Sequence, residues 1–230
     1  SFIDEFGFVK IVGDNVPRFD HDPDTGECKG LLIEPSRTNL IGNSDSAGPA
    51  TSNLGGTAQI NTRVDGITLP TGEVGQVWNY KGNASGGGAR WGDYAGTNNT
   101  SYSGSMWIRT ESGTSSITFD VNDGGVKTYS LTTEWQRMET TASVNDTYRF
   151  MDIYQASPVS IYIWGVQLET GAFPTSYIPT YGTLKTRGAD FTTLLEDDFT
   201  DAISQTEGTL IAEYDNVTSD GYVLSLDGSG

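Results

Sequence analysis

Cysteine and histidine are almost missing from this chain of 230 residues, which contains one of each. Cys28 therefore has no partner for an intrachain disulfide, so the fold depends on noncovalent packing and suits a reducing cytoplasm. Zinc sites need several His or Cys ligands, and one of each excludes such a site unless chains share ligands. A serine hydrolase needs a histidine base, yet His21 lies in a predicted turn and no Gly-x-Ser-x-Gly elbow occurs.

Positive charge is scarce as well. Lys and Arg number 13 against 30 Asp and Glu, which gives a formal net charge of -17. A surface this acidic repels phosphate backbones and anionic lipids, so we expect neither a nucleic-acid nor a membrane partner. The carboxylates offer oxygen ligands for calcium or magnesium, although a solvated surface explains them more simply.

Long apolar runs are the third absence. No stretch reaches the length that spans a membrane, and no signal-peptide pattern occurs. The sequence begins at Ser1 without a methionine and ends within a predicted strand and turn. We therefore expect it to be an excerpt from a longer polypeptide.

What the chain does contain is typical of strands and tight turns. Glycine accounts for 29 residues and charged residues for only 19%. Short alternating or β-branched runs recur between turn signals, and Asp123–Gly125 (Asp-Gly-Gly) predicts a hairpin. This pattern predicts an all-β fold, an antiparallel β-sandwich. The predicted strands are Gly75–Lys81, Gly86–Tyr94, Tyr102–Arg109, Ser115–Asn122, Val126–Leu131, Thr133–Val144, Arg149–Gln155 and Ser160–Leu168.

The most informative stretch is Ile161–Thr180. It opens as a strand rich in β-branched and aromatic residues, and Gly165 within it suggests a bulge. A Trp-Gly-x-Gln-Leu-Glu core, Trp164 to Glu169, is followed by Gly-Ala-Phe-Pro-Thr-Ser-Tyr-Ile-Pro, Gly171 to Pro179. This string resembles the closing segment of a β-sandwich common in bacteriophage fibre, tail and other virion proteins. That domain is similar to the jelly-roll carbohydrate-binding modules attached to xylanases and cellulases.

The first forty residues carry a second part of the same resemblance. The phage family has an arm with Pro-Arg-Phe-Asp, a turn, Gly-Leu-Leu-Ile-Glu and Arg-Thr-Asn-Leu, and this chain matches it at Pro17–Asp20, Gly30–Glu34 and Arg37–Leu40. The resemblance implies an N-terminal arm at 1–42, a jelly-roll sandwich at 43–180 and a linker at 181–206. Residues 207–230 resemble the first strands of a concanavalin or laminin-G-like lectin domain, too short to close such a sandwich alone.

The resemblance also implies a function. It predicts a structural component of a phage virion, in a tail fibre, head fibre or capsid appendage, made in the host cytoplasm and carried on the particle. We expect a homotrimer that contacts other virion proteins and attaches to host-surface glycans. The alternative is a purely structural spacer that binds only virion proteins. A fragment of a polysaccharide-degrading tailspike is a weaker alternative, because the 30 acidic residues single out no catalytic pair.

Sugar recognition needs an aromatic platform beside planar hydrogen-bonding groups. One glycine-flanked stretch supplies this chemistry, and two tyrosines could join it from neighbouring strands. The candidate carbohydrate-binding residues are Arg90, Trp91, Asp93, Tyr94, Tyr102 and Tyr129. The alternative is that Trp91 and Tyr94 are core or subunit-contact aromatics. We interpret Trp107, Trp135 and Trp164 as core.

No cofactor or catalytic residue is predicted, and a structural calcium has no assigned place. Asp20, Asp22 and Asp24 have the spacing of half a calcium loop, but the glycine that such a loop needs comes one place late, at Gly26. We therefore interpret this segment as a turn.

Overall fold

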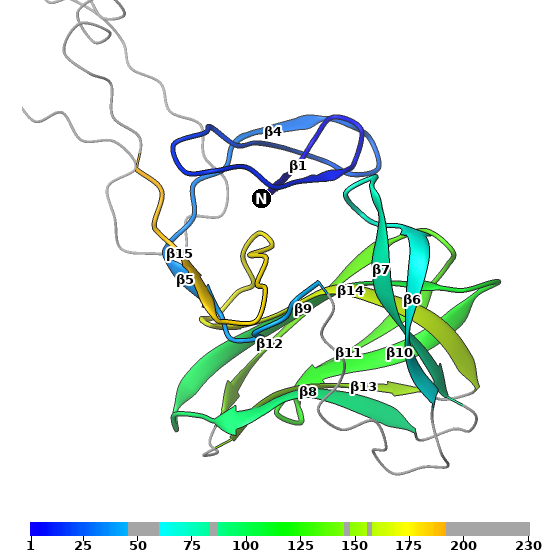
Figure 1. Ribbon diagram of the computed structural model, residues 1–230. Helices are drawn as coiled ribbons and strands as arrows, with labels where there is room; N and C mark the ends of the chain where they lie inside the picture. Colours follow the sequence, from blue (N-terminus) through cyan, green and yellow to red (C-terminus); the bar gives the residue numbers. More distant parts are fainter. Residues whose placement is uncertain (46–59, 83–86, 145–147, 156–157, 192–230) are drawn as a thin grey trace, which may run out of the picture. The chain divides into compact units, whose positions relative to one another are not determined.

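The computed structural model (Figure 1) describes residues 1–45, 60–82, 87–144, 148–155 and 158–191, with backbone only for three of them: Ile60, Asp93 and Tyr94. The chain divides into two compact units, Ser1–Asp190 and Phe191–Gly230. Only Phe191 of the second unit is described, so the strands predicted at 207–230 lie outside the described residues. In the described part, no helix is long and apolar enough to cross a membrane.

The first unit is built on two antiparallel sheets, which confirms the predicted all-β sandwich (Figure 1). The five-stranded sheet has the order β12-β9-β14-β7-β6, and the four-stranded sheet has the order β11-β10-β13-β8. All eight predicted strands of the sandwich are present. The bounds are β6 Ile60–Thr68, β7 Val74–Gly82, β8 Gly88–Ala95, β9 Thr100–Thr110, β10 Ser115–Val121, β11 Gly124–Leu131, β12 Gln136–Val144, β13 Tyr148–Gln155 and β14 Val159–Thr170.

The core between the sheets follows from period-two alternation. On β10, Ile117, Phe119 and Val121 are buried on one face, as the sequence predicts. Met151 and Ile153 on β13 are buried in the same cluster, which also takes large side chains from the five-stranded sheet. The side chains that alternate with these buried residues along β10 and β13 point to the other face of the four-stranded sheet.

One strand, β6, is absent from the strands predicted from the sequence, the first of which begins at Gly75. It pairs with β7 at the edge of the five-stranded sheet. Most of its described side chains are partly or fully exposed, so the stretch lacks the apolar alternation that marks a half-buried strand. Its pairing with β7 is a long-range contact that local composition does not reveal.

The hairpin between β10 and β11 turns one residue earlier than predicted. Asn122 and Asp123 have φ values of +50° and +57°, and Val121 pairs with Gly124. Two left-handed residues in sequence are the signature of a type I′ turn. The Asn122 amide holds the turn in place, since it donates to the Tyr148 carbonyl at 2.6 Å and accepts from the Phe150 N–H at 2.9 Å.

The bulge predicted at Gly165 is confirmed. The pairing of β14 with β9 shifts between Trp164 and Gln167, and Gly165 has a φ of +64°. The extra residue reverses the alternation of β14, so that Gln167 and Glu169 point away from the core while Leu168 points into it. Without the bulge, these two polar side chains would face the apolar core.

The arm forms short two-stranded ribbons before the sandwich begins. β1 (Phe2–Ile3) pairs with β2 (Val9–Lys10), and β3 (Phe19–His21) pairs with β4 (Cys28–Leu31). A third ribbon joins β5 (Arg37–Asn39) to β15 (Lys185–Arg187), which lie side by side in Figure 1. Residues 181–190 therefore belong to the first unit, where the sequence-based boundaries had placed the start of a linker.

A second apolar cluster lies outside the sandwich core. It joins Trp107 and Trp164, which are 7% and 4% exposed, to Val9, Tyr177 and other residues. The Trp164 and Tyr177 rings are 4.7 Å apart. Both tryptophans are thus buried as predicted, but they pack under the arm and the closing turn instead of between the sheets. Trp135 is partly buried against the same cluster, and its indole N–H donates to the Thr68 carbonyl.

The family-like motifs of the arm and the closing segment meet in one buried ionic cluster, which we call the clasp. The Glu34 carboxylate binds Arg18 at 2.6 Å and Arg187 at 2.9 Å. It also accepts from the backbone and side chain of Ser176 at 2.7 Å each. Asp190 pairs with Arg18 and accepts from the Glu34 N–H. Segments more than 140 residues apart in the chain are joined here.

Three further motif residues hold the closing turn through backbone hydrogen bonds. The Asn39 amide donates to the Ile178 carbonyl and accepts from the Leu168 N–H. Gln167 accepts from the Ile178 N–H at 2.6 Å, and Glu169 accepts from the Thr175 N–H at 2.8 Å. Asn39, Gln167 and Glu169 are fully buried, so each would be destabilising without these partners.

Candidate functional site

A row of charged residues crosses the four-stranded sheet on the face turned away from the core. Asp120 on β10 is the cross-strand partner of Asp152 on β13, and Asp152 is the partner of Arg90 on β8. Alternation places Phe150 and Tyr154 on the same face of β13 as Asp152, while Met151 points into the core. These residues from three strands form the outer-face site.

Arg90 is held in a defined plane. Its Nε donates to Asp152 Oδ1 at 2.8 Å and its Nη2 donates to Asp152 Oδ2 at 2.6 Å, which is the two-pronged arginine–carboxylate geometry. The guanidinium carbon lies 3.4 Å from the centroid of the Phe150 ring. Hydrogen bonding to Asp152 raises the pKa of Arg90. The side chain keeps 21% of its surface exposed, so the fixed guanidinium can still contact a ligand.

Asp152 is fully buried, and its charge is satisfied within the site. Besides the two bonds from Arg90, its Oδ2 accepts from the Tyr154 hydroxyl at 3.0 Å. Burial, followed by the nearby Asp152 carboxylate, raises the pKa of Tyr154 to about 12. Tyr154 therefore stays a neutral hydrogen-bond donor across the physiological range.

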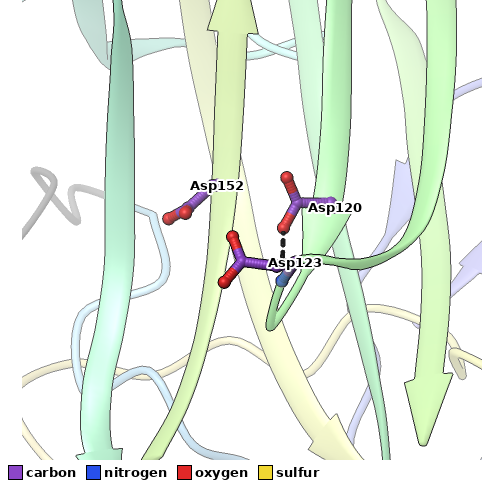
Figure 2. A group of neighbouring side chains, drawn as sticks. All are labelled: Asp120, Asp123 and Asp152. Atoms are coloured by element: carbon purple, nitrogen blue, oxygen red, sulfur yellow. Dashed lines mark hydrogen bonds between the residues drawn. The ribbon is translucent and has the colours of Figure 1, made fainter. Parts of the chain in front are cut away.

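Two more carboxylates lie beside Asp152 at the β10–β11 turn. Figure 2 shows Asp120, Asp123 and Asp152 with their carboxylates gathered, and ligand oxygens of all three lie within 4.8 Å of one another. Asp120 is 3% exposed and accepts from the Asp123 N–H at 3.0 Å, whereas Asp123 is exposed. Burial and then the charge of Asp152 raise the pKa of Asp120 to about 6.

The three carboxylates do not fit a metal site well. Both oxygens of Asp152 already accept from Arg90, whose positive charge opposes a second cation nearby. The other calcium-like spacing is a turn, as interpreted from the sequence. Asp22 accepts from the N–H groups of Asp24 and Thr25, while Asp20 accepts from the Ile3 N–H, so their carboxylates serve separate backbone partners.

The raised pKa of Asp120 predicts that this residue makes the fold less stable as the pH rises. A carboxyl with a higher pKa in the folded state favours folding when protonated, so its contribution falls as pH rises from about 4 to about 6. Asn in place of Asp120 keeps an acceptor for the Asp123 N–H and removes the charge. We expect Asp120→Asn to raise the free energy of unfolding at pH 7.5 by roughly 1–2 kcal/mol.

Urea unfolding of both proteins at pH 4, 5, 6 and 7.5 measures this difference. The gain from Asp120→Asn should shrink steadily toward pH 4, where Asp120 is protonated in the folded state and about half protonated in the unfolded state, whose pKa is the ordinary 3.8. A gain that is equal at all four pH values, or a loss at pH 7.5, would show that Asp120 does not titrate as described.

Of the four candidate carbohydrate-binding residues whose side chains are described, only Arg90 lies on this outer face. Trp91 and Tyr102 are each 2% exposed and pack in the core, so they cannot form a surface platform. Tyr129 packs against the core, and its hydroxyl is bound to the Glu139 backbone. Asp93 and Tyr94 lie on β8, but their side chains are outside the described residues.

Sequence reasoning missed Phe150, Asp152 and Tyr154. Their spacing at i, i+2 and i+4 in the predicted strand Arg149–Gln155 already places them on one face. The pairing of that strand with β8, which brings Arg90 beside Asp152, could not be read from the sequence.

The sandwich is similar to several solved structures. No family model matches the chain, and no curated protein matches its sequence. Among solved structures, the CBM22-1 xylan-binding domain from Paenibacillus barcinonensis aligns with a TM-score of 0.42 at 12% identity, over 58% of this chain and 92% of that one. The structure resembles carbohydrate-binding modules.

Two further solved structures align at similarly low sequence identity. The family 11 carbohydrate-binding module from Clostridium thermocellum, solved with a mixed-linked tetrasaccharide, has a TM-score of 0.36 at 10% identity, over 60% of this chain and 96% of that one. The enzymatically active domain of tailspike protein 4 from bacteriophage CBA120 has a TM-score of 0.37 at 11% identity. That alignment covers 52% of this chain but only 19% of the tailspike.

Proposed function

We propose that the first unit is a noncatalytic carbohydrate-binding β-sandwich and that a glycan contacts the outer-face site around Arg90. The observation that carries this proposal is the fixed guanidinium of Arg90, stacked on Phe150 and bound in two places by Asp152. A pyranose offers hydroxyl edges, and the guanidinium keeps N–H donors for them beyond the two that bind Asp152. Phe150 is 6% exposed and lies against the guanidinium, so it positions Arg90 and does not itself stack on a sugar ring. Because Arg90 is already ordered, binding loses little side-chain entropy.

Charge supports a preference for uncharged glycans. Asp152 neutralises Arg90, which leaves Asp120 and Asp123 as the remaining charges described above for the site. With a formal net charge of -17 for the chain, an anionic polysaccharide would be repelled at long range and at the site.

The proposal places this module in a phage virion, as part of a tail fibre, head fibre or capsid appendage. The support is the pair of motifs in the arm and the closing segment, whose polar residues meet in the clasp. In the same context, we propose a homotrimer in contact with other virion proteins. A structural spacer remains the main alternative, because buried ion pairs such as Arg90–Asp152 also occur without a ligand.

A glycan array probed with the complete 230-residue chain separates these functions. We expect binding to at least one class of uncharged host-surface glycan, with no release of reducing ends during incubation. Binding to no glycan at all would contradict the proposal and favour the spacer. Release of reducing ends would instead show a polysaccharide-degrading activity and contradict the noncatalytic assignment.

A further inference from the structure

The β3–β4 ribbon of the arm has an exposed apolar face that the sandwich does not cover. Phe19 on β3 and Leu31 on β4 are direct cross-strand partners, and Ile33 follows two residues after Leu31. Their exposed fractions are 51%, 42% and 51%. We call these three residues the apolar ribbon face.

The opposite side of the same ribbon is firmly anchored. Arg18 and Glu34, the sequence neighbours of Phe19 and Ile33, are buried in the clasp. Alternation therefore fixes the direction of the apolar ribbon face, since Arg18 and Glu34 point inward and their neighbours point outward. The ribbon cannot turn this face inward without breaking the clasp, which excludes local collapse as a way to bury it.

Apart from Lys29, the exposed charged residues of the ribbon and its turn are negative. Both arm lysines are paired within the arm, Lys10 with Asp4 at 3.2 Å and Lys29 with Asp22 at 3.4 Å. Among the described residues, no ion pair reaches the exposed carboxylates of Glu5, Asp14, Asp24 and Glu27.

Several of these carboxylates lie near one end of the ribbon. The backbone carbonyl of Glu5 is packed so closely on Gly26 that a side-chain carbon there would lie 2.7 Å from it. Glu5 is thereby brought to the β3–β4 turn that carries Asp24 and Glu27. The arm thus combines a directed apolar face with an acidic margin that has no charge compensation of its own within the described residues.

We infer that the apolar ribbon face docks a partner protein whose contact surface is apolar and bordered by Lys or Arg. Apolar area supplies the affinity, and complementary charge supplies the specificity and the rate of encounter. A second copy of this chain fits less well, because it would bring the same acidic margin against the first, and like charges at an interface oppose association. This surface is separate from the outer-face site, which lies on the four-stranded sheet.

Three model peptides of equal Leu and Phe content, with net charges of +3, 0 and -3, serve as probes of the complete chain. Binding is measured by fluorescence anisotropy of the labelled peptide and by protection of Cys28, which is exposed on β4, from alkylation. The basic peptide should bind at least about 10-fold more tightly than the acidic one at low salt and lose most of this advantage in about 1 M salt.

The double variant Phe19→Ser/Ile33→Ser should weaken binding of the basic peptide at least about 10-fold. Both side chains are half exposed, so the variant should stay folded, and an unchanged urea-unfolding transition checks this independently of glycan binding. Val74→Ser removes a 71% exposed apolar residue from β7 and is the matched control, with unchanged peptide binding expected.

Three results would overturn the inference. One is binding that does not depend on peptide charge, or no binding of any peptide. Another is binding that Phe19→Ser/Ile33→Ser leaves intact. The third is an oligomer of the wild-type chain, seen by sedimentation, that the double variant converts to monomers, because a second copy would then cover the apolar ribbon face.

Discussion

Replacing Glu34 with glutamine is expected to lower the free energy of unfolding by about 3–5 kcal/mol, the usual effect of removing one partner from a buried ion pair. Glu34 is 8% exposed and its carboxylate lies between the guanidiniums of Arg18 and Arg187. A neutral amide leaves these two cations facing each other and gives Ser176 a weaker acceptor. The same change loosens the arm and the closing turn together, because both are joined at Glu34.

Urea unfolding at neutral pH measures this effect, and Glu27→Gln is the matched control. Glu27 is exposed and has no ion pair among the described residues, so its replacement should change the free energy of unfolding by less than about 0.5 kcal/mol. If Glu34→Gln were as mild as the control, the clasp would not be the element that holds the arm.

The pH dependence of the same variant gives a second check. Burial by itself raises the pKa of Glu34, but the charge of Arg187 and the hydrogen bonds from Ser176 and Arg18 outweigh it, so the pKa lies below its ordinary value of 4.5. A carboxyl with a lowered pKa stabilises the fold above its ordinary pKa and loses that contribution as pH falls through the folded-state value. Wild type should therefore lose more stability than Glu34→Gln in acid below pH 4.5.

Gly165→Ala is expected to cost about 2–5 kcal/mol, the sum of left-handed backbone strain and local crowding. Gly165 has a φ of +64°, and a side-chain carbon there would lie 2.9 Å from Cδ1 of Trp107. Trp107 is 7% exposed within the second apolar cluster, so it has little room to move. Thermal unfolding monitored by tryptophan fluorescence reports both the stability and the local environment.

Gly66→Ala separates the two contributions. Gly66 has a φ of +78°, but nothing lies within 4 Å of the place where its side chain would begin. This variant should cost about 1–2 kcal/mol, the strain alone. Equal losses in Gly66→Ala and Gly165→Ala would mean that contact with Trp107 adds nothing.

The sheet structure could be predicted largely from the sequence because alternation is local. Ile117, Phe119 and Val121 define the buried face of β10 without any knowledge of the neighbouring strands. In the same way, Gly165 marks the bulge of β14. The same rule exposes the error at the candidate site. Arg90 and Trp91 are adjacent in one strand, so they must point to opposite faces, and they could not both serve one surface site.

What could not be predicted depends on long-range pairing. Asp152 becomes the partner of Arg90 only because β13 lies next to β8, with more than fifty residues between them. The clasp has the same origin, since Glu34 and Arg187 come from opposite ends of the first unit. In both cases the residue types are visible in the sequence, while the chain topology decides which of them meet.

The measurement that tests the central claim most directly is calorimetric titration of a glycan found on the array into wild type and Arg90→Met/Asp152→Leu. Removing both partners of the ion pair leaves neither of them as an unpaired buried charge, so the double variant should stay about as stable as wild type. Arg109→Gln is the control, because Arg109 also stacks on aromatic rings, those of Trp135 and Tyr162, but on the other sheet. We expect at least a 10-fold loss of affinity, about 1.4 kcal/mol, in the double variant and none in the control. Wild-type affinity in a folded Arg90→Met/Asp152→Leu protein would contradict the proposal.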